Sequence, residues 1–329
     1  MTDIAPHITA FLRQRLPVER GASQHTCDTY AYAFQIFFEF ASRKLGVPPS
    51  ALQLEQLDAP LVLDFLDYLQ TVRGNRPRTR NARLTAIKSF MRYVEYREPG
   101  ALEQIRRILG IPVQKTDTRL VDHLTAEQSK AILDAPEPTT RLGIRDRTMN
   151  HLSLTGGLRV SELVGLRLDA VAFKSRYVDL HVHGKGRKDR ILTLWKVVAE
   201  SVRAWLAVRG DALVPELFLN ARGKHMTRAG FEYVLRTHAS TAQAHCPSLG
   251  GKRISPHVLR HTCALNILQA TGDIRKVALW LGHESIQTTE DYLRVDVTQR
   301  ISVIDTVLPH QLRPGKFRPP DKLIASFRG

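Results

Sequence analysis

Cysteine, long apolar runs and acidic residues are all scarce in this chain of 329 residues. Its three cysteines, Cys27, Cys246 and Cys263, are widely separated and odd in number, which argues against a disulfide framework and favours a reducing cytosol. No apolar run reaches the ~18–20 residues that cross a bilayer. The first residues also lack the basic-then-apolar order of a signal peptide. We therefore expect a cytoplasmic protein.

Positive charge, by contrast, is abundant. The chain has 48 Lys+Arg against 32 Asp+Glu, which gives a formal net charge of +16. A surplus of this size predicts a polyanionic partner, most often nucleic acid, although ribosomal and membrane-surface proteins are also basic. Hydrophobic residues make up 43% of the chain, enough for ordinary cores, so wholesale disorder is excluded. At ~100–200 residues per domain, the length predicts two domains.

The first hundred residues show apolar side chains at helical spacing and no competing strand pattern. Helices are predicted over 24–44, 58–72 and 78–96, and the first should end near Gly46. This part of the chain, residues 1–112, is therefore predicted to be a small helical bundle. A stretch of mixed polarity at 113–121 is predicted to be a linker.

The rest of the chain mixes helices with one change of period. Residues 177–194 alternate apolar and polar side chains around the turn GKGRKDR, which predicts a β-hairpin with a basic loop. Thr125 and Gln128 form a capping box that starts a helix. Further helices are predicted over 142–153, 160–167, 197–209, 227–243, 256–270 and 273–281. We expect a mainly α fold with a small β-sheet over 122–309, followed by a basic, proline-rich tail at 310–329.

The third predicted helix and the loop before it form a cationic segment. Between Thr71 and Arg92 there are seven basic residues and no acidic one. Arg76, Arg80, Arg83 and Lys88 are three to five residues apart, so they are expected to line one flank of the helix and its entry loop. With Arg78, they are predicted to contact DNA phosphates. The alternative is a solvated surface helix that happens to lack acids.

Two segments of the second half carry cations suited to work at a phosphodiester. TGGLRVSELVGLR, at 155–167, places Arg159 at the start of a helix with Glu162 three residues later on the same face. GKGRKDR places Lys185 in a glycine-flanked turn, where its ammonium could protonate a leaving oxygen. Taken singly, Arg159 could be a surface cation and the turn a solvated loop.

Two later segments add histidines, a second arginine and a tyrosine. SPHVLRHTCALNIL puts His257 and Arg260 near a helix N-terminus, a natural pair for the oxygens of a phosphate. In WLGHESIQTTEDY, His283 follows a helix-ending glycine and Tyr292 lies nine residues later. Taken singly, the pair could be exposed helix residues and Tyr292 a half-buried core residue.

In order, these residues give the pattern R…K…HxxR…H…Y, and here the sequence resembles the tyrosine recombinase (phage integrase) family, close to its Xer-like and mobile-element members. The N-terminal helices, including TRNARLTAIKSFMRYV, resemble the core-binding domain of that family. The resemblance implies a SAM-like DNA-binding domain at 1–112 and a catalytic domain at 122–309, which together clamp double-stranded DNA. It also implies a homotetramer on two duplexes, with a partner recombinase as a further possibility.

The resemblance also implies roles for the motif residues. Tyr292 would attack a DNA phosphodiester and form a 3′-phosphotyrosyl link, while Arg159 and Arg260 would clamp the phosphate and stabilise its transition state. Lys185 would protonate the departing 5′-oxygen. His257 would be the acid/base partner of the tyrosine.

The same resemblance implies that His283 would support the phosphate by hydrogen bonding. It also implies that Glu162 would hold the arginine and histidine elements in place. Because the covalent link stores the free energy of the bond, rejoining would need neither ATP nor a cofactor. We also find no spacing typical of a metal site and expect none. The tail after Tyr292 would dock on a neighbouring subunit through Val303, Ile304, Val307 and Leu308, with an intramolecular helix as the alternative.

Three other functions compete with recombination. A type IB topoisomerase shares the chemistry, but the separate helical N-terminal domain and the segment from LGH to the tyrosine favour a recombinase. A DNA-binding accessory protein with lapsed catalysis would be expected to lose at least one motif residue, and all six are present. A metal-dependent nuclease would need clustered carboxylates, and we find no convincing cluster.

Overall fold

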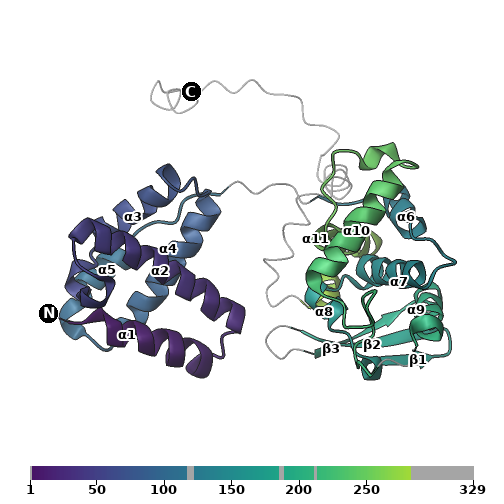
Figure 1. Cartoon of the computed structure of the whole chain (residues 1–329), viewed down its shortest axis with the longest axis horizontal. Helices are drawn as coiled ribbons and strands as arrows, with labels where there is room; N and C mark the ends of the chain where they lie inside the picture. The colour runs from purple at the N-terminus through teal and green to yellow at the C-terminus, as the bar shows by residue number, and fades with distance from the viewer. Residues whose placement is uncertain (1, 117–121, 185–188, 211–212, 283–329) are drawn as a thin grey trace, which may run out of the picture. The chain divides into compact units, whose positions relative to one another are not determined.

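The computed structural model describes residues 2–116, 122–184, 189–210 and 213–282. The chain divides into two compact units, Met1–Thr118 and Arg119–Gly329, and the division lies within the predicted linker. Each unit is described by itself (Figure 1). The described residues do not include three of the predicted catalytic residues, Lys185, His283 and Tyr292, or the C-terminal tail.

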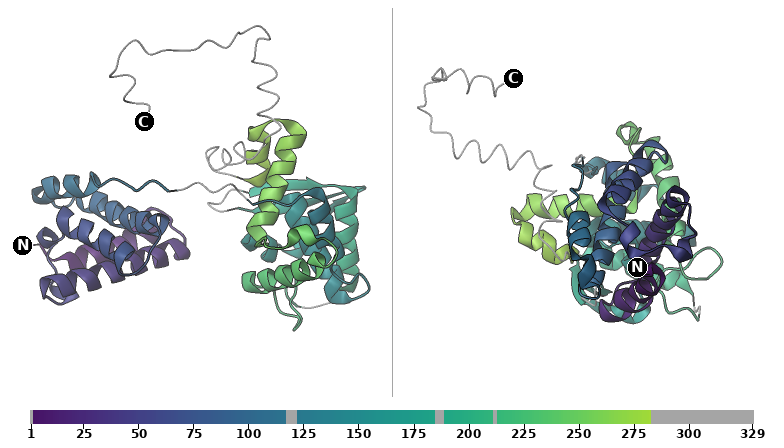
Figure 2. Two further views of the ribbon diagram at one scale, coloured as in Figure 1. Left: turned by 90° about the horizontal axis from the view of Figure 1, so that it is seen from above. Right: turned by 90° about the vertical axis from the view of Figure 1, so that its left-hand side faces the viewer.

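Unit 1 is a helical bundle, as the sequence predicts (Figure 2). Local chemistry sets the bounds of its helices. The side chain of Asp58 accepts a hydrogen bond from the backbone N–H of Leu61 and so caps α3, while α2 ends at Gly46, whose φ of 70° suits glycine. The elements are α1 (Ile4–Ala10), a π-helix (Phe11–Glu19), α2 (Gln24–Leu45), α3 (Ala59–Thr71), α4 (Pro77–Val94) and α5 (Leu102–Leu109), with short 3₁₀ turns at Pro49–Ala51, Leu54–Gln56 and Pro99–Ala101.

Phenylalanine dominates the core of unit 1. The ring of Phe11 lies 5.4 Å from that of Phe90, and the rings of Phe37 and Phe65 lie 4.9 Å apart. All four side chains are buried. Because each such ring buries roughly 150–250 Å², a few of them stabilise a bundle of this size.

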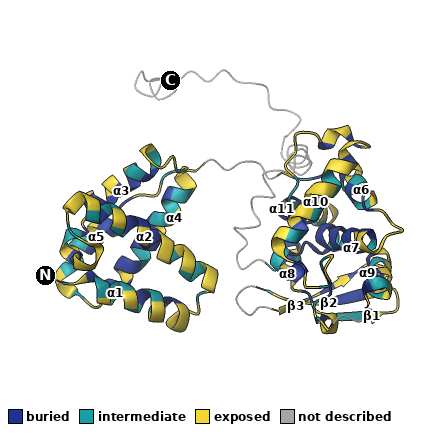
Figure 3. Ribbon diagram, viewed as in Figure 1, coloured by how far each residue is buried: buried dark blue, intermediate teal, exposed yellow. Residues whose placement is uncertain are grey.

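Unit 2 surrounds one buried helix, α7 (Arg141–Gly156), which packs against α9 (Lys196–Arg209) and α11 (Pro256–Thr271). Figure 3 shows α7 buried along most of its length. A capping box between Thr125 and Gln128 starts α6, as predicted. The other helices are α6 (Ala126–Asp134), α8 (Val160–Val164), α9 (Lys196–Arg209), α10 (Arg228–Gln243), α11 (Pro256–Thr271) and α12 (Ile274–Leu281), with 3₁₀ turns at Leu168–Ala170 and Pro247–Leu249.

The sheet of unit 2 has three antiparallel strands in the order β1-β2-β3. The predicted hairpin is confirmed as β2 (Tyr177–His183) and β3 (Asp189–Leu194), whereas β1 (Val171–Lys174) was not predicted. In the register of the hairpin, Val182 lies opposite Arg190. The mainly α fold with a small sheet is therefore confirmed. Among the described residues, no helix combines the length and apolarity needed to cross a membrane.

Two of the cations predicted on the flank of α4 are not exposed, and their contact with DNA stays a prediction. Arg80 is buried, and burial lowers the pKa of its guanidinium. The reason is helical spacing: Arg80 lies four residues before Leu84 and seven before Ile87, so it shares their inward face. The ammonium of Lys88 is half-buried and donates a hydrogen bond to the carbonyl oxygen of Leu109 at 2.8 Å.

The other three cations of this segment are placed differently. Arg76 and Arg78 are exposed at the start of α4. Arg83 is half-buried, and its guanidinium lies 4.8 Å from the centre of the Tyr32 ring. Of the five predicted contacts, the exposed ones are thus the two at the N-terminal end of the helix.

Candidate active site

A close approach of three helices positions Arg159. The helix α7 ends at Gly157, which has a φ of 59°. A Cβ atom at this position would lie 2.5 Å from Leu281 Cδ2 and 3.0 Å from Cys263 Sγ. Only glycine fits at this position, and its lack of a side chain lets the end of α7 pack directly on α11 and α12. The chain then turns at once into α8, with Arg159 as its N-cap residue.

Glu162 lies at the centre of a group of arginines. Its side chain is only 4% exposed and accepts from Arg159 twice, from the backbone N–H at 2.9 Å and from Nη1 at 2.7 Å. Nη1 of Arg260 lies 3.9 Å from Glu162 Oε2. The sequence predicts that Glu162 holds the arginines, and these contacts are consistent with that role.

Arg190 is a third partner of Glu162 that the sequence prediction missed. Its Nη2 and Nη1 donate to the two carboxylate oxygens at 2.9 and 3.2 Å. Burial raises the pKa of Glu162, but the hydrogen bonds and charge of Arg190 and the hydrogen bonds from Arg159 outweigh burial, so the pKa lies below its usual value. Glu162 is therefore held as a carboxylate. The only available signal was the place of Arg190 on an alternating strand beside the basic loop.

Three consecutive carbonyl groups at the end of α12 also accept hydrogen bonds from these arginines. Arg190 Nε donates to the oxygen of Trp280 at 3.1 Å, and Arg260 Nη2 to that of Leu281 at 2.8 Å. Arg159 Nη2 donates to the oxygen of Gly282 at 3.2 Å. The residue that follows, His283, is the first one outside the described range.

His257 and Arg260 occupy the first turns of α11 but differ in exposure. The side chain of Ser255 caps the helix and Pro256 occupies its first turn, as predicted for this segment. His257 is exposed, whereas Arg260 is 5% exposed and also donates to the carbonyl of Gly157. The structure thus brings Arg159, Glu162 and Arg260 together, and it places His257 at the surface, three residues before Arg260 on α11.

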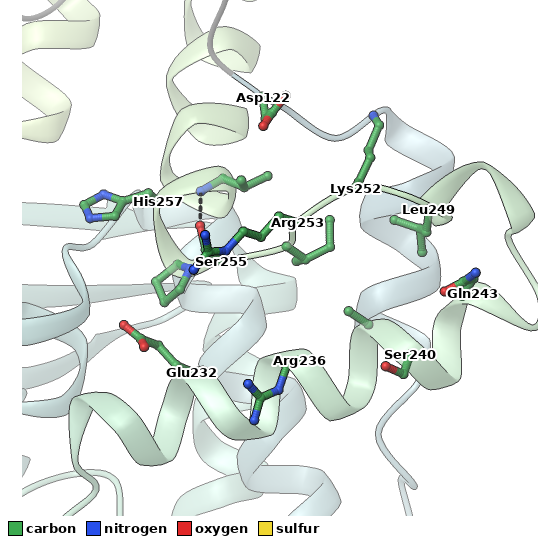
Figure 4. A pocket seen from close by; sticks show the side chains of 14 residues that line it. Asp122, Glu232, Arg236, Ser240, Gln243, Leu249, Lys252, Arg253, Ser255 and His257 are labelled. Atoms are coloured by element: carbon green, nitrogen blue, oxygen red, sulfur yellow. Dashed lines mark hydrogen bonds between the residues drawn. The ribbon is translucent and has the colours of Figure 1, made fainter. Parts of the chain in front are cut away.

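A recess of about 630 Å³ adjoins His257. Figure 4 shows Glu232 and Arg236 of α10 on one side of it, and Arg253 with His257 on the other. Lys252 lines its rim, and its ammonium donates to Gln128 Oε1 at 2.9 Å. The recess carries more positive than negative side chains, which suits a polyanion. Of the residues that line this recess, the sequence prediction included only His257.

The described residues hold no group of three or more histidine, cysteine, aspartate or glutamate side chains that could bind a metal ion. All three cysteines are free thiols. Among the described residues, the charged side chains that meet at the proposed site are Arg159, Arg190, Arg260 and Glu162.

Comparison with known proteins agrees with this architecture. The sequence model of the phage integrase family matches residues 122–299, and that of the phage integrase N-terminal SAM-like domain matches residues 8–98. A Sinorhizobium fredii protein, y4rC, named as an integrase/recombinase, is 41% identical and covers 98% of this chain and 97% of its own. The tyrosine recombinase XerC of Pelobacter propionicus is 32% identical, covering 95% of this chain and 99% of its own.

Solved structures show the same fold. XerH site-specific recombinase bound to palindromic difH substrate superposes with a TM-score of 0.67 at 22% identity, covering 88% of this chain and 81% of its own. A lambda integrase tetramer bound to a Holliday junction superposes with a TM-score of 0.61 at 15% identity, covering 88% and 77%. The fold is that of DNA recombinases of this type. The chain belongs to the phage integrase family of tyrosine recombinases, which are site-specific enzymes that cleave and rejoin DNA.

Proposed function

We propose that this protein cleaves and rejoins duplex DNA at specific sites through a covalent bond between Tyr292 and a 3′-phosphate. The observation that carries the proposal is the Glu162-centred group, in which Arg159 and Arg260 come together beside the segment leading to the nucleophile. Two guanidinium groups side by side match the oxygens of one phosphate, and they stabilise the additional charge of its transition state.

The chemistry needs one proton acceptor and one proton donor. The phenol of Tyr292, with an ordinary pKa near ~10, loses its proton to His257 as its oxygen attacks phosphorus. The bond from phosphorus to the 5′-oxygen breaks, and Lys185 supplies the proton to that oxygen. His283 donates a hydrogen bond to the phosphate. Attack by a 5′-hydroxyl on the phosphotyrosyl link reverses each step, so no cofactor, metal or ATP is needed.

DNA would contact both units. In unit 1 the accessible cations at the start of α4 are Arg76 and Arg78. In unit 2 the recess beside His257 offers Arg236 and Arg253 (Figure 4). Contacts of this kind bind the sugar–phosphate backbone and set the register of the protein along the duplex. We propose that the two units clamp the duplex between these surfaces.

The working form would be a homotetramer on two duplexes. Supporting this, an apolar recess of about 670 Å³ lies between β3, α11 and α12, with Ile191, Trp195 and Leu279 more than half exposed beside it. Its proposed occupant is the tail of a second copy, through Val303, Ile304, Val307 and Leu308. A partner recombinase in the place of some subunits is the alternative. The enzyme would act in the cytoplasm, on DNA of the nucleoid.

The proposal is tested with a labelled duplex from the flanks of the gene, nicked so that cleavage is trapped. Wild type should retain label as a covalent adduct on a denaturing gel with EDTA present. Tyr292→Phe should abolish the adduct, while the control Tyr96→Phe, at an exposed tyrosine of unit 1, should retain it.

Other results would overturn the proposal. Cleavage that EDTA stops, with no adduct, would point to a metal-dependent nuclease. Tight binding without cleavage on every flanking duplex would point to an accessory DNA-binding protein. An adduct accompanied only by relaxation of supercoils, with no strand exchange between two sites, would favour a topoisomerase.

A further inference from the structure

The end of α12 is held by three arginines that share one carboxylate. Arg190, Arg260 and Arg159 donate in turn to the carbonyls of residues 280, 281 and 282 at 3.1, 2.8 and 3.2 Å. Each of the three also lies within 4 Å of Glu162, at 2.9, 3.9 and 2.7 Å. We call this arrangement the arginine clasp.

The clasp satisfies groups that a helix leaves unpaired. The last carbonyls of an α-helix have no partner within the helix, and the end carries partial negative charge. At the end of α12 the chain turns at Gly282, with a φ of 65°, and its N–H donates back to Leu279 O at 3.3 Å. Charge-assisted hydrogen bonds from the guanidinium groups then bind the carbonyl groups that have no partner within the helix or the turn. The clasp thus fixes the point from which the chain continues towards His283 and Tyr292.

The three arginines are not equivalent. The side chain of Arg159 is 31% exposed, so its guanidinium is accessible to a phosphate. Arg190 is 12% exposed, and its three nitrogens are all bound within the protein, two by Glu162 and one by Trp280. A Cβ at Gly282 would lie 2.9 Å from Arg190 Nη1, which shows how closely the side chain covers this turn.

We propose that Arg190 is a positioning residue for the DNA-cleavage reaction. When Arg159 and Arg260 turn towards the scissile phosphate, the link from Glu162 through Arg190 to the end of α12 remains. Arg190 also balances the buried carboxylate, so that Glu162 does not draw the two phosphate-binding arginines away from DNA. This inference rests on the proposed function, because it assigns a task to a residue beside that site.

The balance of charge makes the role of Arg190 testable as a pair interaction. Without Arg190, the carboxylate of Glu162 would be shared by Arg159 and Arg260 alone and would hold both more tightly. Replacing Glu162 by glutamine removes that pull. The effects of Arg190→Met and Glu162→Gln should therefore not multiply, as expected for two groups that act together.

The test measures adduct formation on the nicked duplex under single turnover, as a maximal rate and a half-saturating protein concentration. Arg190→Met should lower the maximal rate by about 100-fold, the cost of a misplaced reacting group, and leave half-saturation nearly unchanged. Arg190→Lys should also be slow, because one ammonium cannot supply three directed donors. The double variant Arg190→Met/Glu162→Gln should be no slower than Glu162→Gln. The matched control is Arg176→Met, an exposed arginine on the β1–β2 turn, which should keep the wild-type rate.

A second measurement decides the inference even if wild type forms no adduct, a result that would count against the proposed function alone. Without DNA, hydrogen exchange of the α12 amides should be faster in Arg190→Met than in wild type and in Arg176→Met, at a temperature where thermal unfolding shows all three folded. Unchanged exchange would overturn the clasp. A wild-type maximal rate in Arg190→Met, or rate effects of the two substitutions that multiply, would overturn the positioning role.

Discussion

The carboxylate of Glu162 binds Arg159 at both ends of that residue: the backbone N–H donates to Oε2 at 2.9 Å and Nη1 donates to Oε1 at 2.7 Å. The first bond starts α8, because the third residue of a helix commonly reaches back to the N-cap. The second aims the guanidinium. N-cap positions usually hold serine, threonine, asparagine or aspartate, so an arginine there ties the start of a helix to the proposed site.

Because Glu162 accepts these two hydrogen bonds as a carboxylate, the stability of the fold in acid tests its role. Because the folded-state pKa of Glu162 lies below its ordinary value of 4.5, its ionised form stabilises the fold. That contribution is present in full above pH 4.5 and is lost as the pH falls through the lowered folded-state pKa. The free energy of unfolding of wild type and Glu162→Gln, measured in urea from pH 7 downwards, should differ by a constant amount above pH 4.5 and converge below it. A difference that stays constant in acid would contradict this account.

Gly157 should tolerate no side chain. Gly157→Ala combines a positive φ with a contact of 2.5 Å to Leu281, so we expect a loss of about 3 kcal/mol or more in the free energy of unfolding. The matched control is Gly223→Ala, where φ is 73° and the added methyl group meets nothing within 4 Å. Strain alone should cost the control about 1–2 kcal/mol. Equal losses in the two variants, measured by urea unfolding, would show that the packing of α7 on α12 is looser than described.

The thiols should differ in reactivity. Burial raises the pKa of Cys263 to about 12, and its sulfur lies 3.1 Å from the carbonyl oxygen of Thr155 as a donor. Since the thiolate is the reactive form, Cys263 should resist iodoacetamide at neutral pH in the folded protein. Cys27 is only half-buried and should be alkylated much sooner. Peptide mass spectrometry over time, with a urea-unfolded control, measures both rates, and early labelling of Cys263 would contradict its burial.

Substitutions of the cations of α4 should have two different effects, one on DNA binding and one on stability. Arg76→Ala and Arg78→Ala should each weaken DNA binding and lower the slope of log affinity against log salt by about 0.9, the value for one phosphate contact. Arg80→Met should instead lower the melting temperature, because the side chain is buried. Fluorescence anisotropy at several salt concentrations gives the slopes.

Arg107→Ala is the control for the loss of one charge, since Arg107 is exposed on α5 and pairs with Glu103. It should leave the salt slope unchanged. A slope that falls equally in Arg107→Ala would mean that net charge, and not the start of α4, governs binding.

Leu279 tests the proposed assembly. It is 77% exposed beside the apolar recess, and Leu279→Glu would place a charge where the tail of a second copy is proposed to dock. We expect adduct formation on a single nicked duplex within about threefold of wild type, because the change lies on the surface. Tetramers on paired duplexes, measured by analytical ultracentrifugation, should be lost. Full assembly by the variant would exclude this recess as the interface.

Helix limits were predictable because single residues determine them. Asp58, Thr125 and Gly46 are capping residues whose effect acts within a few residues, and the structure places each at the end of a helix as predicted. The hairpin was predictable for a similar reason, since its alternation and turn lie within eighteen residues of sequence, 177–194. The short strand β1 was not, because four residues carry too little periodicity.

Long-range partners were beyond the reach of sequence patterns. Arg80 looks like its exposed neighbours in sequence, and only the packing of α4 shows that it is buried. Likewise, Arg190 lies 28 positions from Glu162, and no local rule connects a strand residue to a helix residue at that distance. The ordered motif indicated Arg159, Arg260 and the supporting Glu162, but the third arginine that shares this carboxylate emerges only from the folded chain.

The distribution of aromatic residues gives the molecule its own spectroscopic reporters. The core of unit 1 is built from phenylalanine, while the three tryptophans, Trp195, Trp205 and Trp280, all belong to unit 2. Indole fluorescence therefore follows the folding of unit 2 without a signal from unit 1. Trp280 lies 5.9 Å from Trp195, its indole donates to Thr155 O, and its own carbonyl is bound by Arg190. The emission of this pair reports on the end of α12 with no added label.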